Sequence, residues 1–289
     1  MRRDGSDVQD VEQLRATAVA VAQQVGDFIV RMRAQGAGQV HTKTSATDVV
    51  TAADTAAERL ARRLLAQWRP GEPVLGEEEG GAGSPAGQLC WVVDPIDGTV
   101  NYLYGLPWYA VSVAVQLDGQ SLAAAVGQPA AGRLWSAARG GGADCDGVAV
   151  QASDATQLEL SLIGTGFSYR PERRARQAAM VAGMLPEIRD LRRAGSAALD
   201  LCYVASGRYE AFWEFNLNPW DTAAGVLLVE ESGGRVTDMR GGPFQIASRE
   251  TLATNGLVHE ALMREFEAIF AGRGLEALPS PVEYARGRN

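Results

Sequence analysis

Cysteine, histidine and lysine are all scarce in this sequence of 289 residues. The three cysteines, Cys90, Cys145 and Cys202, are far apart and include no CxxC pair, so we expect neither a disulfide framework nor a structural zinc site. This use of cysteine fits a reducing cytoplasm, which is the expected location. We expect the two histidines, His41 and His259, to be ordinary surface or helix residues rather than metal ligands.

Basic residues are outnumbered by acidic ones. There are 27 Lys and Arg against 35 Asp and Glu, which gives a formal net charge of −8. Such a charge repels the phosphate backbone of DNA and RNA, so no nucleic-acid partner is expected. Lys43 is the only lysine, which raises the question of what an arginine could not do at that position.

Long hydrophobic runs typical of membrane segments are also missing. The longest run without a charged residue covers the twenty residues between Asp97 and Asp118. It has the length of a membrane helix, but Asn101 and Pro107 interrupt it, so we expect part of a buried soluble core and no membrane association. Acidic residues follow from Asp4 onward without an apolar stretch, so we do not expect a secretory signal.

The residues that are abundant indicate a large folded chain, because 46% of them are hydrophobic. Apolar residues at helical spacing predict helices from Val8 to Arg33 and from Thr51 to Arg69. Short apolar or alternating segments then predict strands at 74–75, 89–93, 109–117, 122–126 and 134–137. The first half of the chain therefore reads as helices followed by a sheet.

The second half mixes both kinds of element. The predicted strands are 158–163, 188–191 and 209–215, and the predicted helices are 171–184, 196–205, 219–231 and 257–270. We expect an α/β fold with one domain over residues 8–271, made of lobes at about 8–155 and 156–271. The segment 272–289 is rich in Gly, Pro and Arg, and we expect a flexible tail there.

Three acidic clusters lie at the predicted ends of strands or starts of helices. The first is Gly76-Glu77-Glu78-Glu79-Gly80, directly after the short strand at 74–75. Taken alone, this cluster fits a solvated turn whose charges serve solubility.

The second cluster is Asp94-Pro95-Ile96-Asp97-Gly98-Thr99. Pro95 keeps Asp94 out of a helix, so a turn is expected, and a turn brings Asp94 and Asp97 close together. Two carboxylates at one point call for a cation, and hard oxygen ligands suit Mg²⁺ or Mn²⁺. Gly98 would let a phosphate approach the backbone, and Thr99 adds a hydroxyl. The alternative is an Asx-type turn in which Thr99 caps a helix.

The third cluster, Asn218-Pro219-Trp220-Asp221, begins a helix of small residues. Pro219 fits the first helical position, and a carboxylate at Asp221 in the first turn stabilises a helix start without any further role. The combination of three such clusters at element boundaries is what a multi-metal phosphoryl-transfer site requires.

Together these strings resemble a known family. Gly76-Glu77-Glu78, the DPIDGT segment from Asp94 to Thr99 with Asn101-Tyr102, and the WDTAAG segment from Trp220 to Gly225 are similar to the motifs of the inositol monophosphatases. The resemblance runs from about Val11 to Phe270. It implies a layered αβαβα sandwich of the inositol monophosphatase and fructose-1,6-bisphosphatase type, commonly a homodimer. It further implies a lithium-sensitive, Mg²⁺-dependent phosphatase with two to three Mg²⁺ per site, where Mn²⁺ can substitute.

The resemblance also assigns roles to individual residues. The implied metal ligands are Glu77, Asp94, the carbonyl of Ile96, Asp97 and Asp221. Thr99 with Glu77 would orient and deprotonate the attacking water, and Asp54 would support Thr99. The implied substrate contacts are Asp97, Gly98, Thr99, Gly195, Ser196, Ala197, Glu214 and Asp221. Lys43 matches a lysine near a mobile metal-binding loop, where a compact ammonium suits an anionic cluster better than a guanidinium.

Several functions stay open at this stage. Inositol-1-phosphate is the favoured substrate among small polyol phosphates, but histidinol phosphate, fructose 1,6-bisphosphate and 3′-phosphoadenosine 5′-phosphate are rivals that share the metal site. A regulatory binding protein on the same fold is a second class. A nucleotide-binding oxidoreductase is discounted, because Gly140-Gly141-Gly142 and Gly164-Thr165-Gly166 do not form the GxGxxG fingerprint.

Overall fold

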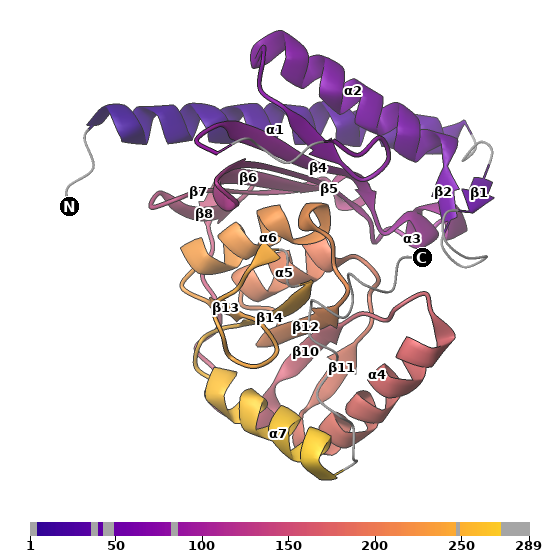
Figure 1. Ribbon diagram of the computed structural model, residues 1–289, viewed down its shortest axis with the longest axis vertical. Helices are drawn as coiled ribbons and strands as arrows, with labels where there is room; N and C mark the ends of the chain where they lie inside the picture. The colour runs from indigo at the N-terminus through magenta and orange to yellow at the C-terminus, as the bar shows by residue number, and fades with distance from the viewer. Residues whose placement is uncertain (1–4, 36–39, 43–48, 82–85, 247–248, 273–289) are drawn as a thin grey trace.

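The helical periodicity at the start of the chain produces the outer helical layer of the computed structural model, which describes residues 5–35, 40–42, 49–81, 86–246 and 249–272. This layer contains α1 (Gly5–Ala34) and α2 (Ala52–Trp68), which lie on one face of a sheet (Figure 1). Their apolar faces enter one hydrophobic cluster with that sheet, including Val21 and Ile29 of α1 and Leu65 of α2. A two-stranded hairpin, β1 (Val40–Thr42) and β2 (Val49–Thr51), precedes α2.

The sheet beneath these helices has seven strands in the order β3-β4-β5-β6-β7-β8-β9. The strands are β3 (Val74–Gly76), β4 (Leu89–Asp97), β5 (Ala110–Leu117), β6 (Gln120–Gln128), β7 (Arg133–Ala138), β8 (Gly142–Cys145) and β9 (Val148–Ala149). All neighbours pair antiparallel except β3 and β4, which are parallel. Both faces of the sheet are covered, and β4 and β5 are accordingly buried almost throughout.

A second helical layer lies on the other face of this sheet. It consists of α5 (Ala197–Ala205) and α6 (Pro219–Glu231), while the short α3 (Thr99–Tyr104) follows β4 directly (Figure 1). Eight of the nine residues of α5 and the stretch 222–229 of α6 are buried, as expected for helices that are apolar on all sides and lie between two sheets. These helices therefore connect the two halves of the chain through one shared core.

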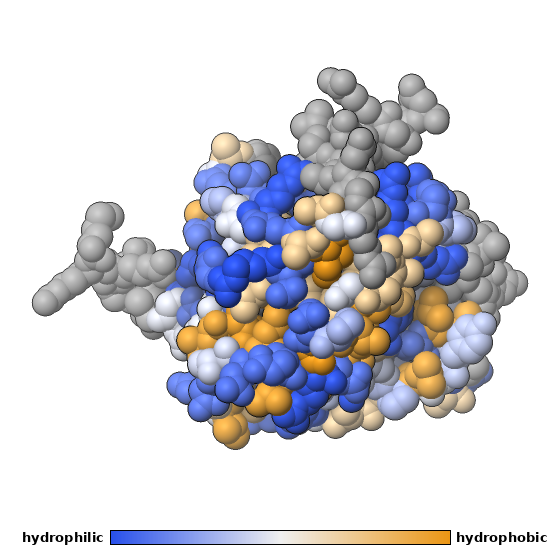
Figure 2. Space-filling model, turned by 90° about the horizontal axis from the view of Figure 1, so that it is seen from below, coloured by the Kyte–Doolittle hydropathy of each residue, from blue (hydrophilic) through white to orange (hydrophobic). Residues whose placement is uncertain are grey.

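The second sheet has five strands in the order β11-β10-β12-β14-β13. They are β10 (Leu162–Thr165), β11 (Asp190–Arg192), β12 (Ala211–Phe215), β13 (Arg235–Thr237) and β14 (Glu250–Thr254). Helices α4 (Pro171–Met184) and α7 (His259–Gly272) cover its outer face. Figure 2 shows this side of the molecule, where hydrophilic residues surround smaller hydrophobic groups.

The predicted layered αβαβα sandwich is confirmed by this order of layers (Figure 1). The two sheets draw on residues 74–149 and 162–254, but the division into lobes near residue 155 stays a prediction, since α5 and α6 pack in a core common to both. Residues 273–289 of the expected tail lie outside the described residues. Within the described residues, none of the helices combines the length and apolar character that a membrane crossing requires.

Several expected elements are wrong in detail. The expected strand at 158–163 begins as a 3-10 turn, Leu158–Leu160, and only then continues as β10. The apolar residues there satisfy packing in either conformation, so their pattern alone does not distinguish the two. Among the described residues, β1, β2, β8, β9, β13, β14 and α3 were not expected, because most are too short or too mixed in composition to show a period.

The expected turn at Asp94–Asp97 is also wrong, because β4 continues through Pro95 to Asp97. The pairing with β5 is irregular at this point: Asp94 lies opposite Ser112 and Asp97 opposite Ala110. Two residues on β4 therefore oppose a single residue on β5, which is a β-bulge. In a regular strand, positions i and i+3 point to opposite faces, and the extra residue brings both carboxylates to the same face.

Candidate active site

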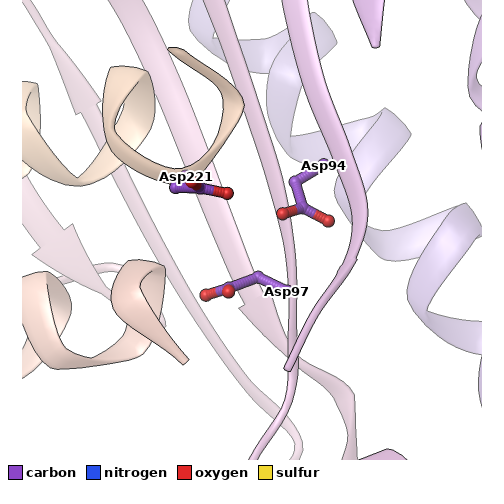
Figure 3. Close-up of side chains that lie close together, drawn as sticks. All are labelled: Asp94, Asp97 and Asp221. Carbon is purple, nitrogen blue, oxygen red and sulfur yellow. The ribbon is translucent and has the colours of Figure 1, made fainter. Parts of the chain in front are cut away.

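Three aspartates from two elements meet at the carboxyl end of β4. Asp94 and Asp97 extend from the bulged end of β4 and Asp221 from the first turn of α6, and their carboxylates face one another (Figure 3). One carboxylate oxygen from each lies within 4.8 Å of the others. Asp94 and Asp97 are buried and Asp221 is partly buried. The chain thus concentrates three acidic groups in a site with little access to water.

The environment of these carboxylates opposes their negative charge. Burial and the neighbouring carboxylates of Glu77, Asp97 and Asp221 raise the pKa of Asp94 well above its usual range. Burial likewise raises the pKa of Asp221, and it raises the pKa of Asp97 to about 6. Within the part of the chain that the structure describes, no basic side chain forms an ion pair with any of the three aspartates. Clustered oxygen ligands with uncompensated charge fit a hard divalent cation.

Asp97 is fixed by the start of α5. Its Oδ2 accepts hydrogen bonds from the Ser196 hydroxyl at 2.6 Å and from the backbone N–H of Ala198 at 2.7 Å. Ser196 is the N-cap of α5, and its Oγ also accepts from the Leu199 N–H at 3.3 Å. These bonds lower the pKa of Asp97 but do not outweigh burial. One oxygen of Asp97 is therefore held by α5, and the other is free to face the site.

Asp221 and Asp94 are each oriented by their own backbone. Asp221 Oδ2 accepts from the Asn218 N–H at 2.6 Å as part of a capping box at the start of α6. Asp94 Oδ1 accepts from the Ile96 N–H at 3.0 Å, which is the Asx-type bond named above as the alternative. Asp94 and Asp221 therefore each stabilise their local backbone and also direct a carboxylate oxygen toward the cluster.

Glu77 lies in the turn after β3, and a buried glutamate on α2 shapes that turn. Glu58 accepts hydrogen bonds from the backbone N–H groups of Glu78 at 2.5 Å and Glu79 at 3.1 Å. A Cβ at Gly76 would collide with the Glu58 carboxylate, so a larger residue there would displace that carboxylate from the turn. Of the three consecutive glutamates, Glu77 lines the cavity of the site, whereas Glu79 pairs with Arg59 at 2.6 Å.

Thr99 and Asp54 form a second pair beside the aspartates. The Thr99 hydroxyl lies 3.0 Å from Asp54 Oδ1 and 3.2 Å from the Ile96 carbonyl oxygen. Asp54 is fully buried at the start of α2, where its other oxygen accepts from the backbone N–H and the hydroxyl of Thr51. The expected helix cap at Thr99 is wrong in detail, because Gly98 occupies the N-cap position of α3.

Gly98 allows three segments to approach closely. Its φ is 96°, and a Cβ there would lie 3.0 Å from the Trp108 carbonyl oxygen and 3.1 Å from that of Gly195. Asn101 joins the same segments, since its Nδ2 donates to the carbonyl oxygens of Trp108 at 2.7 Å and Ala194 at 2.9 Å. The segment before α5 is thereby held against the end of β4.

A cavity of about 440 Å³ opens over the aspartates, within the size range of small-molecule sites. Residues from both halves of the chain line it: Glu77, Asp94, Ile96, Asp97, Gly98, Thr99, Val100, Gly166, Phe167, Ser168, Tyr169, Arg174, Arg193, Gly195, Ala197, Glu214, Leu217 and Asp221. Burial raises the pKa of Glu214 to about 8, although Arg193 acts in the opposite direction. The cavity thus combines the acidic cluster with a wall of mixed polar, aromatic and basic residues.

The structure brings most residues of the sequence-based site to this cavity. Ser196 and Asp54 are behind it, bonded to Asp97 and Thr99 respectively, and Lys43 lies outside the described residues. Tyr102 of the motif is buried, and its hydroxyl donates to the Ile29 carbonyl oxygen. Sequence reasoning missed Glu58, Arg174 and Arg193, because a charged residue on a helix or loop is ordinarily a solvated one.

Comparisons with known proteins agree with this architecture. A family model described as "Inositol monophosphatase family" matches residues 10–271. The chain is 47% identical over 271 residues to the inositol-1-monophosphatase of Mycobacterium leprae, covering 88% of this chain and 93% of that protein. It is 36% identical over 247 residues to the Nus factor SuhB of Escherichia coli strain K12, covering 85% and 92%. The structure of an inositol monophosphatase from Anabaena matches with a TM-score of 0.80 at 31% identity, covering 90% of this chain and 97% of that chain.

Proposed function

The chain belongs to the inositol monophosphatase family, and from this premise we propose that it hydrolyses phosphate monoesters of small polyols, with inositol-1-phosphate as the main substrate. The observation that carries the proposal is the convergence of Asp94, Asp97 and Asp221 within one small cavity. A phosphate monoester is itself negatively charged, so a site lined by carboxylates suits it only when cations are bound between them.

Residues of this chain are well suited to hold Mg²⁺ there. Its ligands would be the carboxylates of Glu77, Asp94, Asp97 and Asp221 with the carbonyl oxygen of Ile96. When bound, Mg²⁺ neutralises charge on the phosphate oxygens and on the leaving oxygen and makes a water a better nucleophile near neutral pH. We further propose two to three Mg²⁺ per site, with Mn²⁺ as a substitute, and sensitivity to lithium.

The protein supplies the orientation and the base. Thr99 donates its hydroxyl proton to Asp54 or to the Ile96 carbonyl, which leaves its oxygen lone pairs directed to accept from an attacking water. Glu77 would take the proton of that water, and Asp54 would hold Thr99 in place. Attack by water needs no covalent intermediate on the protein.

The remaining polar residues would contact the substrate. Gly98 lines the cavity, where its backbone would meet phosphate oxygens, and Gly195 and Ala197 line the cavity beside the polyol. Glu214 would bond the hydroxyl groups of the ring. Ser196 would act on substrate only through Asp97, to which its hydroxyl is bonded.

The substrate assignment is tested by phosphate release. The purified chain is given Mg²⁺ and, in turn, inositol-1-phosphate, histidinol phosphate, fructose 1,6-bisphosphate and 3′-phosphoadenosine 5′-phosphate. We expect the highest kcat/KM for inositol-1-phosphate. A clear preference for histidinol phosphate would overturn the inositol assignment while leaving the reaction class intact.

Further properties are part of the same proposal. We propose a homodimer located in the cytoplasm, built from a catalytic domain of residues 8–271 with a flexible tail. Tyr104 at the end of α3 and Leu106 just beyond it are 77% and 52% exposed and offer apolar surface for subunit contact. Light scattering of the purified chain measures the oligomeric state directly.

A second candidate function is regulatory, through binding of a protein partner. One relative at 36% identity is named a Nus factor, which supports considering it. The intact acidic cluster favours catalysis instead. Phosphatase activity that survives Asp94→Asn would overturn the metal-dependent proposal.

A further inference from the structure

Basic charge is concentrated beside the cavity in a chain that is acidic overall. Residues 167–195, which include α4 and β11, contain seven arginines and only three acidic residues, whereas the whole chain has a net charge of −8. The arginines are Arg170, Arg173, Arg174, Arg176, Arg189, Arg192 and Arg193. Two of them, Arg174 on α4 and Arg193 between β11 and α5, line the cavity that contains the aspartates.

Arg193 has two close neighbours at the cavity. Its guanidinium carbon lies 6.0 Å from the centre of the Phe167 ring, a cation–π contact. Its Nη1 also lies so close to Gly195 that a Cβ there would collide with it. Both neighbours also line the cavity. An exposed arginine usually loses side-chain freedom when it binds a ligand, and these contacts reduce that cost.

The charge of Arg193 is not consumed by a partner carboxylate. Among the described residues, Arg192 pairs with Asp190 at 2.6 Å, whereas Arg193 forms no ion pair. Glu214 also lines the cavity, close enough for Arg193 to lower its pKa, but the two do not form an ion pair. The guanidinium therefore keeps donors for a ligand, and Arg174 adds a second positive charge.

We propose that Arg193, with Arg174, binds a second anionic group where a substrate carries one, so that polyol phosphates with another phosphate or a carboxylate bind more tightly than those without, while inositol-1-phosphate keeps the highest kcat/KM. The proposal rests on the proposed function, because the first phosphate is taken to lie at the aspartates. A neutral polyol would need only hydroxyl partners such as Glu214. A planar guanidinium instead matches phosphate or carboxylate oxygens, with which it forms paired hydrogen bonds.

The test compares two substrates that differ by one phosphate, inositol 1-phosphate and inositol 1,4-bisphosphate, in the wild type and in Arg193→Gln. We expect a lower KM for the bisphosphate in the wild type. Arg193→Gln should raise that KM about tenfold or more, with kcat unchanged and the KM for the monophosphate changed less than about twofold. The wild-type KM for the bisphosphate should also rise with ionic strength more steeply than that of the variant.

Matched variants separate a binding role from general damage. Arg192→Gln removes the neighbouring arginine, which does not line the cavity, and should leave both KM values unchanged. Arg193→Lys keeps the charge but not the paired donors and should fall between wild type and Arg193→Gln. Arg174→Gln should affect the bisphosphate in the same direction as Arg193→Gln.

Two outcomes would overturn the inference: equal loss for both substrates in Arg193→Gln, or no loss for either. If the wild type hydrolyses neither compound, the proposed function fails, and calorimetric dissociation constants of the two compounds decide the inference. Tighter binding of the bisphosphate that disappears in Arg193→Gln supports it, and equal binding of both compounds by the wild type contradicts it.

Discussion

His259 is a buried histidine whose protonation state follows from its neighbours. Its Nδ1 lies 3.0 Å from the Thr254 hydroxyl and its Nε2 lies 3.2 Å from the Thr237 hydroxyl. The Thr237 hydroxyl donates to the Asp238 carbonyl oxygen, so it accepts from Nε2–H. Thr254 Oγ1 accepts from the Gly256 N–H and can donate to Nδ1. The ring is therefore neutral and joins β13, β14 and α7, at whose first position His259 lies buried.

This arrangement predicts a pH dependence of stability. Burial, and secondarily Arg235, lowers the pKa of His259 from 6.5 to about 4. Below pH 6.5 the unfolded chain binds a proton that the folded chain does not, so this residue's contribution to the free energy of unfolding falls between pH 6.5 and 4. From pH 7 to pH 5 the loss is about 2 kcal/mol. Urea unfolding of wild type and His259→Gln at both pH values measures it.

Buried carboxyls such as Asp97, whose pKa is raised, titrate with the opposite sign in this range, so the difference between proteins is the informative quantity. An identical pH dependence in wild type and His259→Gln would show that His259 is not the group responsible.

At the level of residues, sequence reasoning found acids in short ordered strings and missed residues that act from a distance. Asp94, Asp97 and Asp221 were recognised because each belongs to a distinctive string. Glu58 is in an ordinary helical context, and only the fold reveals that it holds the turn of Glu77. Arg193 likewise gains meaning only from the neighbours that the fold gives it.

At the level of elements, the start of α5 acts as a support for the end of β4. Sequence resemblance assigned Ser196 to the substrate, whereas its hydroxyl is engaged by Asp97 and by the Leu199 N–H. We therefore expect Ser196→Ala to cost about 1–3 kcal/mol of stability, since a helix cap and a bond to a carboxylate are lost.

The same variant should raise the Mg²⁺ concentration required for half-maximal activity, with little change in KM for substrate. Ser196→Thr retains the hydroxyl and should behave like wild type. Titrations of activity with Mg²⁺ at saturating substrate, and with substrate at saturating Mg²⁺, separate the two parameters. If Ser196→Ala raised the KM for substrate and left the Mg²⁺ dependence unchanged, Ser196 would contact the substrate directly, and the supporting role proposed for it would be wrong.

Long elements were predictable from sequence, and irregular ones were not. The α1, α2, α4 and α6 helices have clear periods or proline starts, and their residues match the expected ranges within a few positions. The bulge of β4 was read as a turn, because proline next to two aspartates indicates a break in a strand as readily as an irregular strand. The pairing of β4 with β5 decides between a turn and a bulged strand, and the local sequence around Pro95 does not contain that pairing.

At the scale of the molecule, the aspartate cluster joins the seven-stranded sheet to the middle helical layer. Two of its members belong to β4 and the third to α6 (Figure 3). Without a cation, the carboxylates repel one another across the contact between β4 and α6, although the sheet and this helical layer share a hydrophobic core. A cation bound by both elements would turn that repulsion into a stabilising link.

Thermal unfolding with and without Mg²⁺ tests this link. Mg²⁺ at about 100 times its dissociation constant should stabilise the wild type by about 2.7 kcal/mol, which is roughly 5–10 °C in Tm. Asp94→Asn should raise the Tm without Mg²⁺, remove most of the Mg²⁺ effect, and lower kcat by at least about 100-fold. Asp27→Asn changes an exposed aspartate on α1 and should match wild type. A wild-type Tm that is indifferent to Mg²⁺ would contradict the link.

The bulge in β4 also limits how this motif can be moved by protein engineering. The two carboxylates share a face only because β5 offers one residue where β4 has two. If the six residues from Asp94 to Thr99 were grafted onto a regularly paired strand, one aspartate would face the receiving site and the other would face away from it. A transplant of this pair of aspartates must therefore include both the bulged strand and the neighbouring strand that has one residue fewer, so two paired strands are the smallest unit that carries the motif.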